Sequence, residues 1–402
     1  MTESLDQAPG KSPGTETPNP LVRRAAITPG KDRIHINRRD FIRELGALGL
    51  APWAAAAALA QAATAPLQLL AAEKGLLFGS CLALKYFVQA PAYQQLFLTQ
   101  CNISTPEVHM TWNSLSRQPG VYDFGSADSF VAFCAANRLH VRGHTLVWHQ
   151  ALPAWVAPQL TAASGQAIMT DHIRTVAGHF AGKLHSWDVV NEVLDPGSNR
   201  PDGLRDSPWL RGCGVDYIEQ AFRATAAADP NALLVWNENY LEVSNGFGRA
   251  KRTAMLALLD GILARGVPIH GIGIEAHLRA DQAPVLGDAS YEAFLGELAR
   301  RGMKIFITEL DVQDVTLPAD IGARDQAVAA LYSKFLTASL QQPAVKAIVT
   351  WGLADSFTWI AGYRPRKDGL PVRPLPFDAT FQPKAASYAI AETLQSAPRR
   401  NS

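Results

Sequence analysis

Two glutamates, each at the end of an apolar run, are the residues of this chain best suited to chemistry. Glu192 closes the run WDVVNE (187–192), and Glu309 follows the run IFIT (305–308). Such runs predict buried strands, so both carboxylates should lie at strand ends. A carboxylate pair suits glycoside hydrolysis, in which a protonated acid serves the leaving oxygen and an ionised group serves the anomeric carbon. One such glutamate alone would more often be a salt-bridge partner, but two favour catalysis.

From about residue 76 the sequence alternates between strand and helix patterns, and these elements must position the two glutamates. The apolar runs end near eight residues: Ser80, Glu107, His144, Glu192, Glu238, His277, Glu309 and Trp351. Helical patterns fill gaps at 125–137, 212–228, 249–264 and 321–341. Eight units over residues 70–395 predict one α/β domain, a (β/α)8 TIM barrel, whose catalytic residues gather at the carboxyl ends of its strands. A doubly wound open sheet is the alternative, but it would gather functional residues from fewer strand ends.

The first 62 residues precede these alternating strands and helices. Residues 1–36 are rich in Pro, Gly, Ser, Thr and charge without apolar periodicity, which predicts a disordered tail. Residues 37–62 combine Arg38-Arg39 with a short apolar run and the small-residue pattern AQA (60–62), as a twin-arginine signal peptide does. We therefore expect an exported, periplasmic or secreted catalytic domain, residues 66–397, with no membrane span after cleavage. An uncleaved membrane anchor is the alternative.

Composition excludes several classes of protein. A net charge of +1 over 402 residues gives no electrostatic reason to expect a nucleic-acid partner. The four cysteines lack CxxC spacing, so no zinc or dithiol redox site is indicated, and whether Cys81 and Cys101 form a disulfide stays open. No glycine-rich fingerprint follows the first strand, which argues against an oxidoreductase. We expect a monomer without a cofactor.

Four ordered motifs resemble the signatures of a known family. They are WDVVNE (187–192), ITELD (307–311), RGHTLVWH (142–149) and WGLADSFTW (351–359), and they are similar to those of glycoside hydrolase family 10, the endo-β-1,4-xylanase family. The similarity spans roughly residues 75–395. It implies a retaining (β/α)8 enzyme that cleaves the xylan backbone without a metal, with Glu192 as acid/base and Glu309 as nucleophile.

The same resemblance implies supporting roles that suit the residue types. Asn191, beside the acid, can donate to a sugar 2-hydroxyl in an oxocarbenium-like transition state. His277 and Asp311 would form a hydrogen-bonded pair that keeps Glu309 ionised. Seven further residues would bind or wall the sugar: Glu107, His144, Trp148, Asn237, Glu275, Trp351 and Trp359. For His277 a core histidine is the alternative, as core packing is for any one of the tryptophans.

Two stretches depart from the family pattern. After Glu107, Val108 stands where Asn is usual and Thr111 where Lys is usual, which removes hydrogen bonds to the sugar one step further from the cut. Asn239-Tyr240 also reverses the usual order of that pair. Two explanations compete: a xylanase with weakened or rebuilt distal glycone binding, which we favour, or a relative acting on a different β-linked glycan or glycoside.

Glu275 is the third departure, because it stands where Gln is usual. A third carboxylate near Glu192 would raise the pKa of that acid by repulsion, or would itself stay protonated. We expect Glu275 to shift the pH optimum.

Two other functional classes fit less well. A catalytically silent glycan-binding barrel predicts the loss of one carboxylate, but Glu192 and Glu309 are both present. A metal-dependent hydrolase would need ligands at several strand ends, and a set can be drawn up from His144, His149, His277, Glu275 and Asp311. The same positions match a metal-free glycosidase, which makes a metal site the weaker hypothesis.

Overall fold

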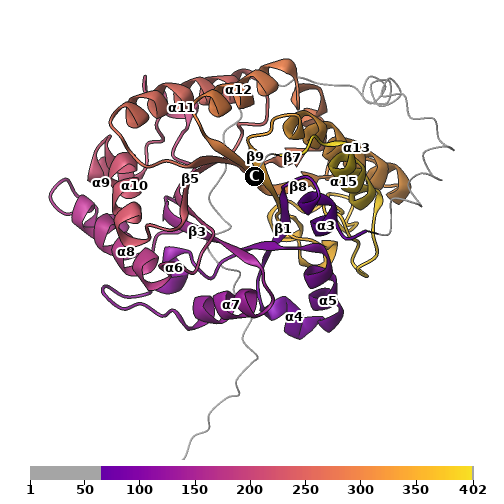
Figure 1. Cartoon of the computed structure of the whole chain (residues 1–402), viewed down its shortest axis with the longest axis horizontal. Helices are drawn as coiled ribbons and strands as arrows, with labels where there is room; N and C mark the ends of the chain where they lie inside the picture. Colours follow the sequence, from indigo (N-terminus) through magenta and orange to yellow (C-terminus); the bar gives the residue numbers. More distant parts are fainter. Residues whose placement is uncertain (1–64, 401–402) are drawn as a thin grey trace, which may run out of the picture. The chain divides into compact units, whose positions relative to one another are not determined.

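The computed structural model describes residues 65–400, in which eight parallel strands close into a barrel (Figure 1). The strands are β1 (Leu77–Leu82), β2 (Ile103–Pro106), β3 (His140–Trp148), β4 (Ser186–Asn191), β5 (Leu233–Glu238), β6 (Gly271–Ile274), β8 (Lys304–Gln313) and β9 (Val345–Thr350). Each strand pairs in parallel with its neighbours, and the β6–β8 pairing closes the ring. The predicted (β/α)8 barrel is confirmed.

Helices surround these strands. The α-helices are α3 (Leu67–Ala72), α4 (Lys85–Gln89), α5 (Pro91–Gln100), α6 (Trp112–Leu115), α7 (Gly125–Ala136), α8 (Gly165–His179), α9 (Pro208–Cys213), α10 (Tyr217–Ala228), α11 (Gly246–Ala264), α12 (Ala289–Arg300), α13 (Ile321–Leu340), α14 (Ile360–Tyr363) and α15 (Ala385–Ser396). Short 3-10 turns are η2 (Ala157–Gln159), η3 (Pro196–Ser198), η4 (Ala280–Val285) and η5 (Asp355–Phe357). The prediction of one helix over 212–228 is wrong. Gly214, with φ 77°, ends α9 in a left-handed conformation that a helix cannot continue.

Three strand ends differ from the expected positions. Strands β3 and β8 run on past His144 and Glu309, which therefore lie within strands. His277 does not end the sixth barrel strand. That strand stops at Ile274, and Ala276 (φ 60°) turns the chain into a separate short strand, β7 (His277–Arg279), which pairs with β8.

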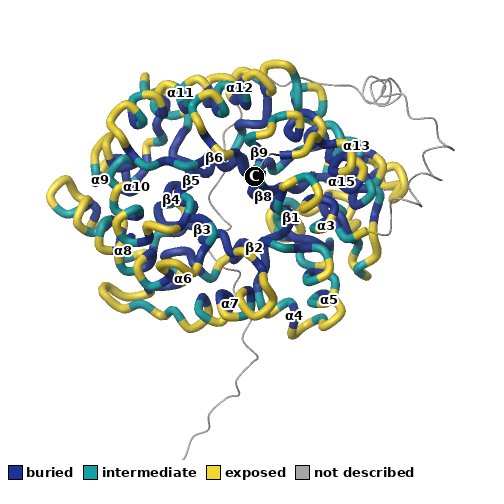
Figure 2. Tube along the Cα trace, viewed as in Figure 1, coloured by how far each residue is buried: buried dark blue, intermediate teal, exposed yellow. Residues whose placement is uncertain are grey.

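The core lies mainly between the strands and the surrounding helices. Trp187 and Trp236, on neighbouring strands, are fully buried there. Gly143 on β3 makes room for Trp187, because a Cβ at this glycine would lie 2.3 Å from the indole ring. Val235, Phe306 and Ala347, from β5, β8 and β9, form a separate buried cluster. Figure 2 shows the resulting pattern of buried strands and helices whose outer faces are exposed.

The two ends of the described chain meet beside α3 and α15. The backbone N–H of Arg400 donates to the carbonyl of Lys74 at 2.8 Å, and the Arg400 guanidinium donates to the carbonyl of Leu340 at 2.7 Å. All four cysteines are free, so Cys81 and Cys101 form no disulfide.

The predicted tail (1–36) and signal peptide (37–62) lie outside the described residues. Within residues 65–400, no helix has both the length and the apolar character that crossing a bilayer requires.

Candidate active site

Glu192 and Glu309 are both buried and are linked through Asn237, which lies near the end of β5. Glu192 directly follows β4 and is 8% exposed, and Glu309 on β8 is 5% exposed. The Glu192 N–H donates to the Asn237 carbonyl at 3.1 Å, and the Asn237 side-chain amide donates to Glu309 Oε1 at 2.8 Å. The barrel therefore brings the two predicted carboxylates to one site.

Glu309 is surrounded by groups that favour its ionised form. Burial alone would raise its pKa, but the hydrogen bond from His277 Nε2 (3.1 Å) and the charges of His144 and His277 act the other way. With the Asn237 bond, these groups hold the pKa of Glu309 below its ordinary value. A carboxylate kept ionised in this way is available as a nucleophile.

Glu192 is in the opposite electrostatic state. Burial raises its pKa, and Arg205 and Lys251 offset this only in part because the charges of Glu238 and Glu309 also raise it. Its direct side-chain partner is Gln150, whose Nε2 donates to Oε2 at 3.3 Å. A carboxyl group with a raised pKa retains the proton that a general acid needs.

His277 and Asp311 form the predicted pair beside Glu309. His277 Nδ1 lies 3.0 Å from Asp311 Oδ2, and the indole N–H of Trp359 donates to that same oxygen at 2.8 Å. Burial would lower the pKa of His277, but the charge and hydrogen bond of Asp311 and those of Glu309 raise it well above its ordinary value. The imidazolium form can donate to both carboxylates, which orients Glu309.

His144, Trp351 and Trp359 lie around Glu309 and His277, and Trp148 lies beside His144. The His144 ring is 6.0 Å from the Trp148 ring and 5.4 Å from Trp351, and the His277 ring is 5.0 Å from Trp359. His144 Nδ1 lies 4.0 Å from Glu309 Oε1. Aromatic rings of this kind can stack on the apolar face of a sugar ring.

Asn191 also belongs to the site. Its Oδ1 accepts a hydrogen bond from the Asn237 amide at 2.7 Å, and this contact orients the Asn191 amide nitrogen. Glu275, two residues before His277, is 2% exposed and contacts the same Asn237 amide at 3.4 Å.

The β2 end of the site contains Glu107. Burial raises the pKa of Glu107, against the effects of Tyr86 and Lys85, and its Oε2 is buried without a partner among the described residues. Thr111 is 6% exposed and its hydroxyl donates to the Val108 carbonyl at 2.9 Å, while the Val108 side chain is 46% exposed. Neither Val108 nor Thr111 brings a side-chain amide or ammonium group to this end of the site.

Comparison with models of known protein families shows the family of this chain. The model described as glycosyl hydrolase family 10 matches residues 66–393, most of the chain. The chain belongs to glycosyl hydrolase family 10.

Relatives of this family 10 chain carry xylanase names. Endo-1,4-beta-xylanase B of Thermotoga neapolitana is 34% identical over 311 residues, covering 76% of this chain and 84% of the relative. Beta-1,4-xylanase of Dictyoglomus thermophilum is 36% identical over 313 residues, covering 75% and 84%. The structure of xylanase 10B from Thermotoga petrophila RKU-1 in complex with xylobiose superposes with a TM-score of 0.75 at 32% identity, covering 83% of this chain and 98% of that one.

Sequence reasoning missed several polar residues of this family 10 site. Asp188 on β4 accepts from the buried guanidinium of Arg142 and lies 2.9 Å from His144 Nδ1. An aspartate inside an apolar strand must be paired, which was a usable signal for this role. Arg205 comes from an irregular segment, and its Nε donates to the Glu192 carbonyl at 2.7 Å. No motif marks that residue.

Three site residues are close enough together to raise the question of a metal. One ligand atom each of Glu275, His277 and Glu309 lies within 4.8 Å of the other two. However, both nitrogens of His277 are already hydrogen bonded to carboxylates, so an ion would have to displace the bond to Glu309. The prediction of a metal-free site stays a prediction.

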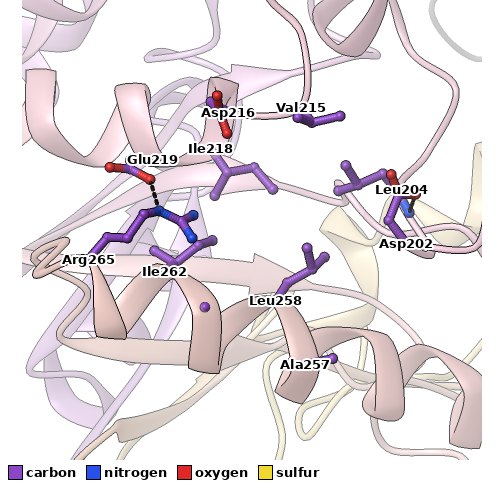
Figure 3. Close-up of a pocket in the computed structure, with 11 residues that line it drawn as sticks. Asp202, Leu204, Val215, Asp216, Ile218, Glu219, Ala257, Leu258, Ile262 and Arg265 are labelled. Atoms are coloured by element: carbon purple, nitrogen blue, oxygen red, sulfur yellow. Dashed lines mark hydrogen bonds and ion pairs between the residues drawn. The ribbon is translucent and has the colours of Figure 1, made fainter.

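The cavity in Figure 3 is lined by residues other than those of this site. It has a volume of about 300 Å³ and is lined chiefly by α10, α11 and the segment before α10, with Leu204, Ile218 and Leu258 among its apolar residues. Glu219 and Arg265 pair at its edge at 2.6 Å. Its lining contains no aromatic ring and none of the predicted site residues.

Proposed function

We propose that this chain is a retaining endo-β-1,4-xylanase, with Glu309 as the nucleophile and Glu192 as the acid/base. The observation that carries this proposal is the opposite shift in the pKa of two buried carboxyl groups, in a site where Asn237 contacts the backbone of Glu192 and the side chain of Glu309. The pKa of Glu309 is lowered and that of Glu192 is raised. Double displacement needs this division of roles, and the names of the relatives support xylan as the substrate.

In the first step, an oxygen of Glu309 forms a bond to the anomeric carbon while the bond from that carbon to the leaving sugar oxygen breaks. Glu192 gives its proton to that oxygen. His277 and Asn237 hold Glu309 in line during the attack, since they donate to different oxygens of its carboxylate. The product of this step is a sugar ester of Glu309.

In the second step, the ionised Glu192 takes a proton from water as the water oxygen attacks the anomeric carbon. The ester bond breaks, Glu309 regains its charge, and the anomeric configuration is restored. Asn191 supports both steps by donating to the sugar 2-hydroxyl, with its amide orientation set by Asn237.

Product analysis over a substrate panel tests the function. The panel contains xylan, arabinoxylan, glucuronoxylan, mixed-linkage glucan and aryl β-glycosides. We expect internal cuts in xylan that release a mixture of xylo-oligosaccharides, whose new reducing ends are initially β by NMR. If xylan stayed intact while another polymer was degraded, the enzyme would act on a different β-linked substrate. Val108, whose side chain is exposed, and Thr111, whose hydroxyl donates to the Val108 carbonyl, would then be part of that altered specificity.

We also propose that the protein is exported through residues 37–62 and acts as a monomer. The sequence of Arg38-Arg39 and the apolar run that follows support export. Replacing both arginines by lysine should retain the protein in the cytoplasm, as cell fractionation would measure. Light scattering of the purified enzyme tests the monomer.

A further inference from the structure

Glu275 is fixed by its backbone against the nucleophile strand. Its N–H donates to the Glu238 carbonyl on β5 at 3.1 Å, and its carbonyl accepts from the Glu309 N–H on β8 at 3.0 Å. Its side chain is buried next to Asn237, whose amide nitrogen lies 3.4 Å from Glu275 Oε1. Glu275 is therefore a fixed part of the site rather than a mobile surface carboxylate.

The hydrogen-bond capacity of Asn237 leaves Glu275 without a strong donor. The Asn237 side-chain oxygen accepts from the Thr308 hydroxyl at 2.7 Å, and the end of the amide that faces the ionised Glu309 is the nitrogen, because a carboxylate can only accept. That nitrogen has two hydrogens but faces three oxygens, of Asn191 at 2.7 Å, Glu309 at 2.8 Å and Glu275 at 3.4 Å. The two short bonds use both hydrogens, so an ionised Glu275 would be a buried charge with no good donor from Asn237.

The charged groups around Glu275 do not supply a free cation either. Carboxylates face it from three elements: Glu309 on β8, Glu192 after β4 and Glu238 on β5. The neighbouring cation is His277, which already bonds to Glu309 and Asp311. Lys251 is paired with Glu238 at 2.6 Å. A third ionised carboxylate here would therefore raise the electrostatic energy of the site.

We propose that Glu275 holds a proton in the working enzyme and is a neutral positioning residue beside the nucleophile rather than an acid or base. This inference rests on the proposed function for its role, but its protonation state can be measured without any substrate. Burial raises the pKa of Glu275 well above its ordinary value, and the charges of Glu309 and Glu192 add to this effect, which supports the geometric argument.

The pH dependence of stability gives the test a definite sign. A glutamic acid with a raised pKa in the folded state binds more protons folded than unfolded, so its contribution to stability is lost as pH rises above the ordinary glutamate pKa. Glu275→Gln removes this loss. The difference in melting temperature, variant minus wild type, should therefore increase by about 2 °C per pH unit between the ordinary glutamate pKa and the folded pKa of Glu275.

Glu219→Gln is the matched control. Glu219 lies on α10 and pairs with Arg223 and Arg265, whose hydrogen bonds lower its pKa despite some burial. Its contribution to stability is gained as pH rises through its folded pKa, so this variant should fall behind wild type as pH increases. Glu219→Gln should therefore show its slope below the ordinary glutamate pKa and none above it, where Glu275→Gln shows a slope of opposite sign.

Infrared difference spectra of the same proteins near neutral pH provide the direct reading. Relative to wild type, Glu275→Gln should lose a protonated-carboxyl stretch, whereas Glu219→Gln should lose a carboxylate stretch. Loss of a carboxylate stretch in Glu275→Gln, or a melting difference that does not grow with pH, would overturn the proposal. If Glu275→Gln does not fold, Glu275→Met offers the same comparison with another uncharged side chain. A chain that proved inactive on xylan would refute the proposed function but leave these two results unchanged.

Discussion

At Glu309 the cost of burying a carboxylate is offset by two hydrogen bonds and by the nearby charge of His144, whereas the side chain of Glu192 accepts one longer hydrogen bond, from Gln150. His277 and Asn237 contact Glu309 at 3.1 and 2.8 Å, and His144 lies 4.0 Å away. The same residue type therefore takes two roles because of its immediate partners. The sequence predicted both residues from the apolar runs that precede them, but it could not predict which carboxyl would have fewer hydrogen-bond donors.

Glu192→Ala should affect the hydrolysis of xylan much more than that of aryl β-xylosides with good leaving groups. We expect xylan turnover to fall by roughly 10²–10⁴-fold, because the leaving sugar oxygen needs a proton. Aryl β-xylosides with good leaving groups need little protonation, so a rapid burst of released phenol should survive. Stopped-flow absorbance measures this burst. Equal loss of the burst and of xylan turnover would contradict the acid role, and Glu309→Ala is the control that should lose both.

His277→Asn should shift the acidic limb of the kcat/KM profile to higher pH. The charge and hydrogen bond of His277 lower the pKa of Glu309, so removing them raises that pKa and protonates the nucleophile earlier as pH falls. We expect a shift of about 1 unit or more. The control is His179→Asn at the end of α8, which pairs with Asp128 and should move neither limb. An unmoved acidic limb in His277→Asn would refute this role.

At the scale of elements, the site exists because parallel strands end at one face of the barrel. The strand-end residues could be predicted from apolar runs, since a buried parallel strand has few polar residues before its end. The turn at Ala276 could not be predicted from the sequence. An alanine with a positive φ has no local sequence signal, and backbone hydrogen bonds to β5 and β8 hold this turn. That turn sets the positions of both Glu275 and His277.

Asp188 joins strands β3 and β4, and Asp188→Asn should weaken the fold there. Arg142 and Asp188 are both fully buried, so the variant leaves the guanidinium without its counter-charge. We expect a loss of about 3–5 kcal/mol in the free energy of unfolding, measured by urea titration. The exposed pair of Asp171 and Arg174 on α8 gives the comparison, because Asp171→Asn should cost about 0.5 kcal/mol or less. Similar losses in the two variants would show that the buried pair contributes little.

The segment after β2 carries a prediction about specificity. Val108 is exposed and offers no hydrogen bond, so Val108→Asn should supply an amide to the distal sugar. We expect KM for xylo-oligosaccharides to fall by about 5-fold with kcat little changed, as one added hydrogen bond would produce. The matched variant is Val215→Asn in the segment before α10, where the valine is also exposed. If both variants leave KM unchanged, the segment after β2 does not contact the distal sugar.

At the scale of the whole molecule, the alternation of eight strands with helices was sufficient to predict a closed barrel. It could not show how the described chain ends are joined, because the Arg400 bonds to Lys74 and Leu340 link residues far apart in sequence. It also could not show that Thr308, Asn191 and Glu309 all meet at Asn237. Local patterns predict elements, whereas such convergence arises only when the barrel closes.

In the proposed mechanism Glu309 forms a covalent ester with the sugar, while Glu192 donates and then accepts the proton. The most direct measurement uses a 2-deoxy-2-fluoro-xylobioside with a good leaving group, in which the fluorine slows both steps and the leaving group restores the first. Mass spectrometry should find one added disaccharide unit, and peptide mapping should place it on Glu309. An adduct on another residue, or xylan hydrolysis that inverts the anomeric configuration, would contradict the account.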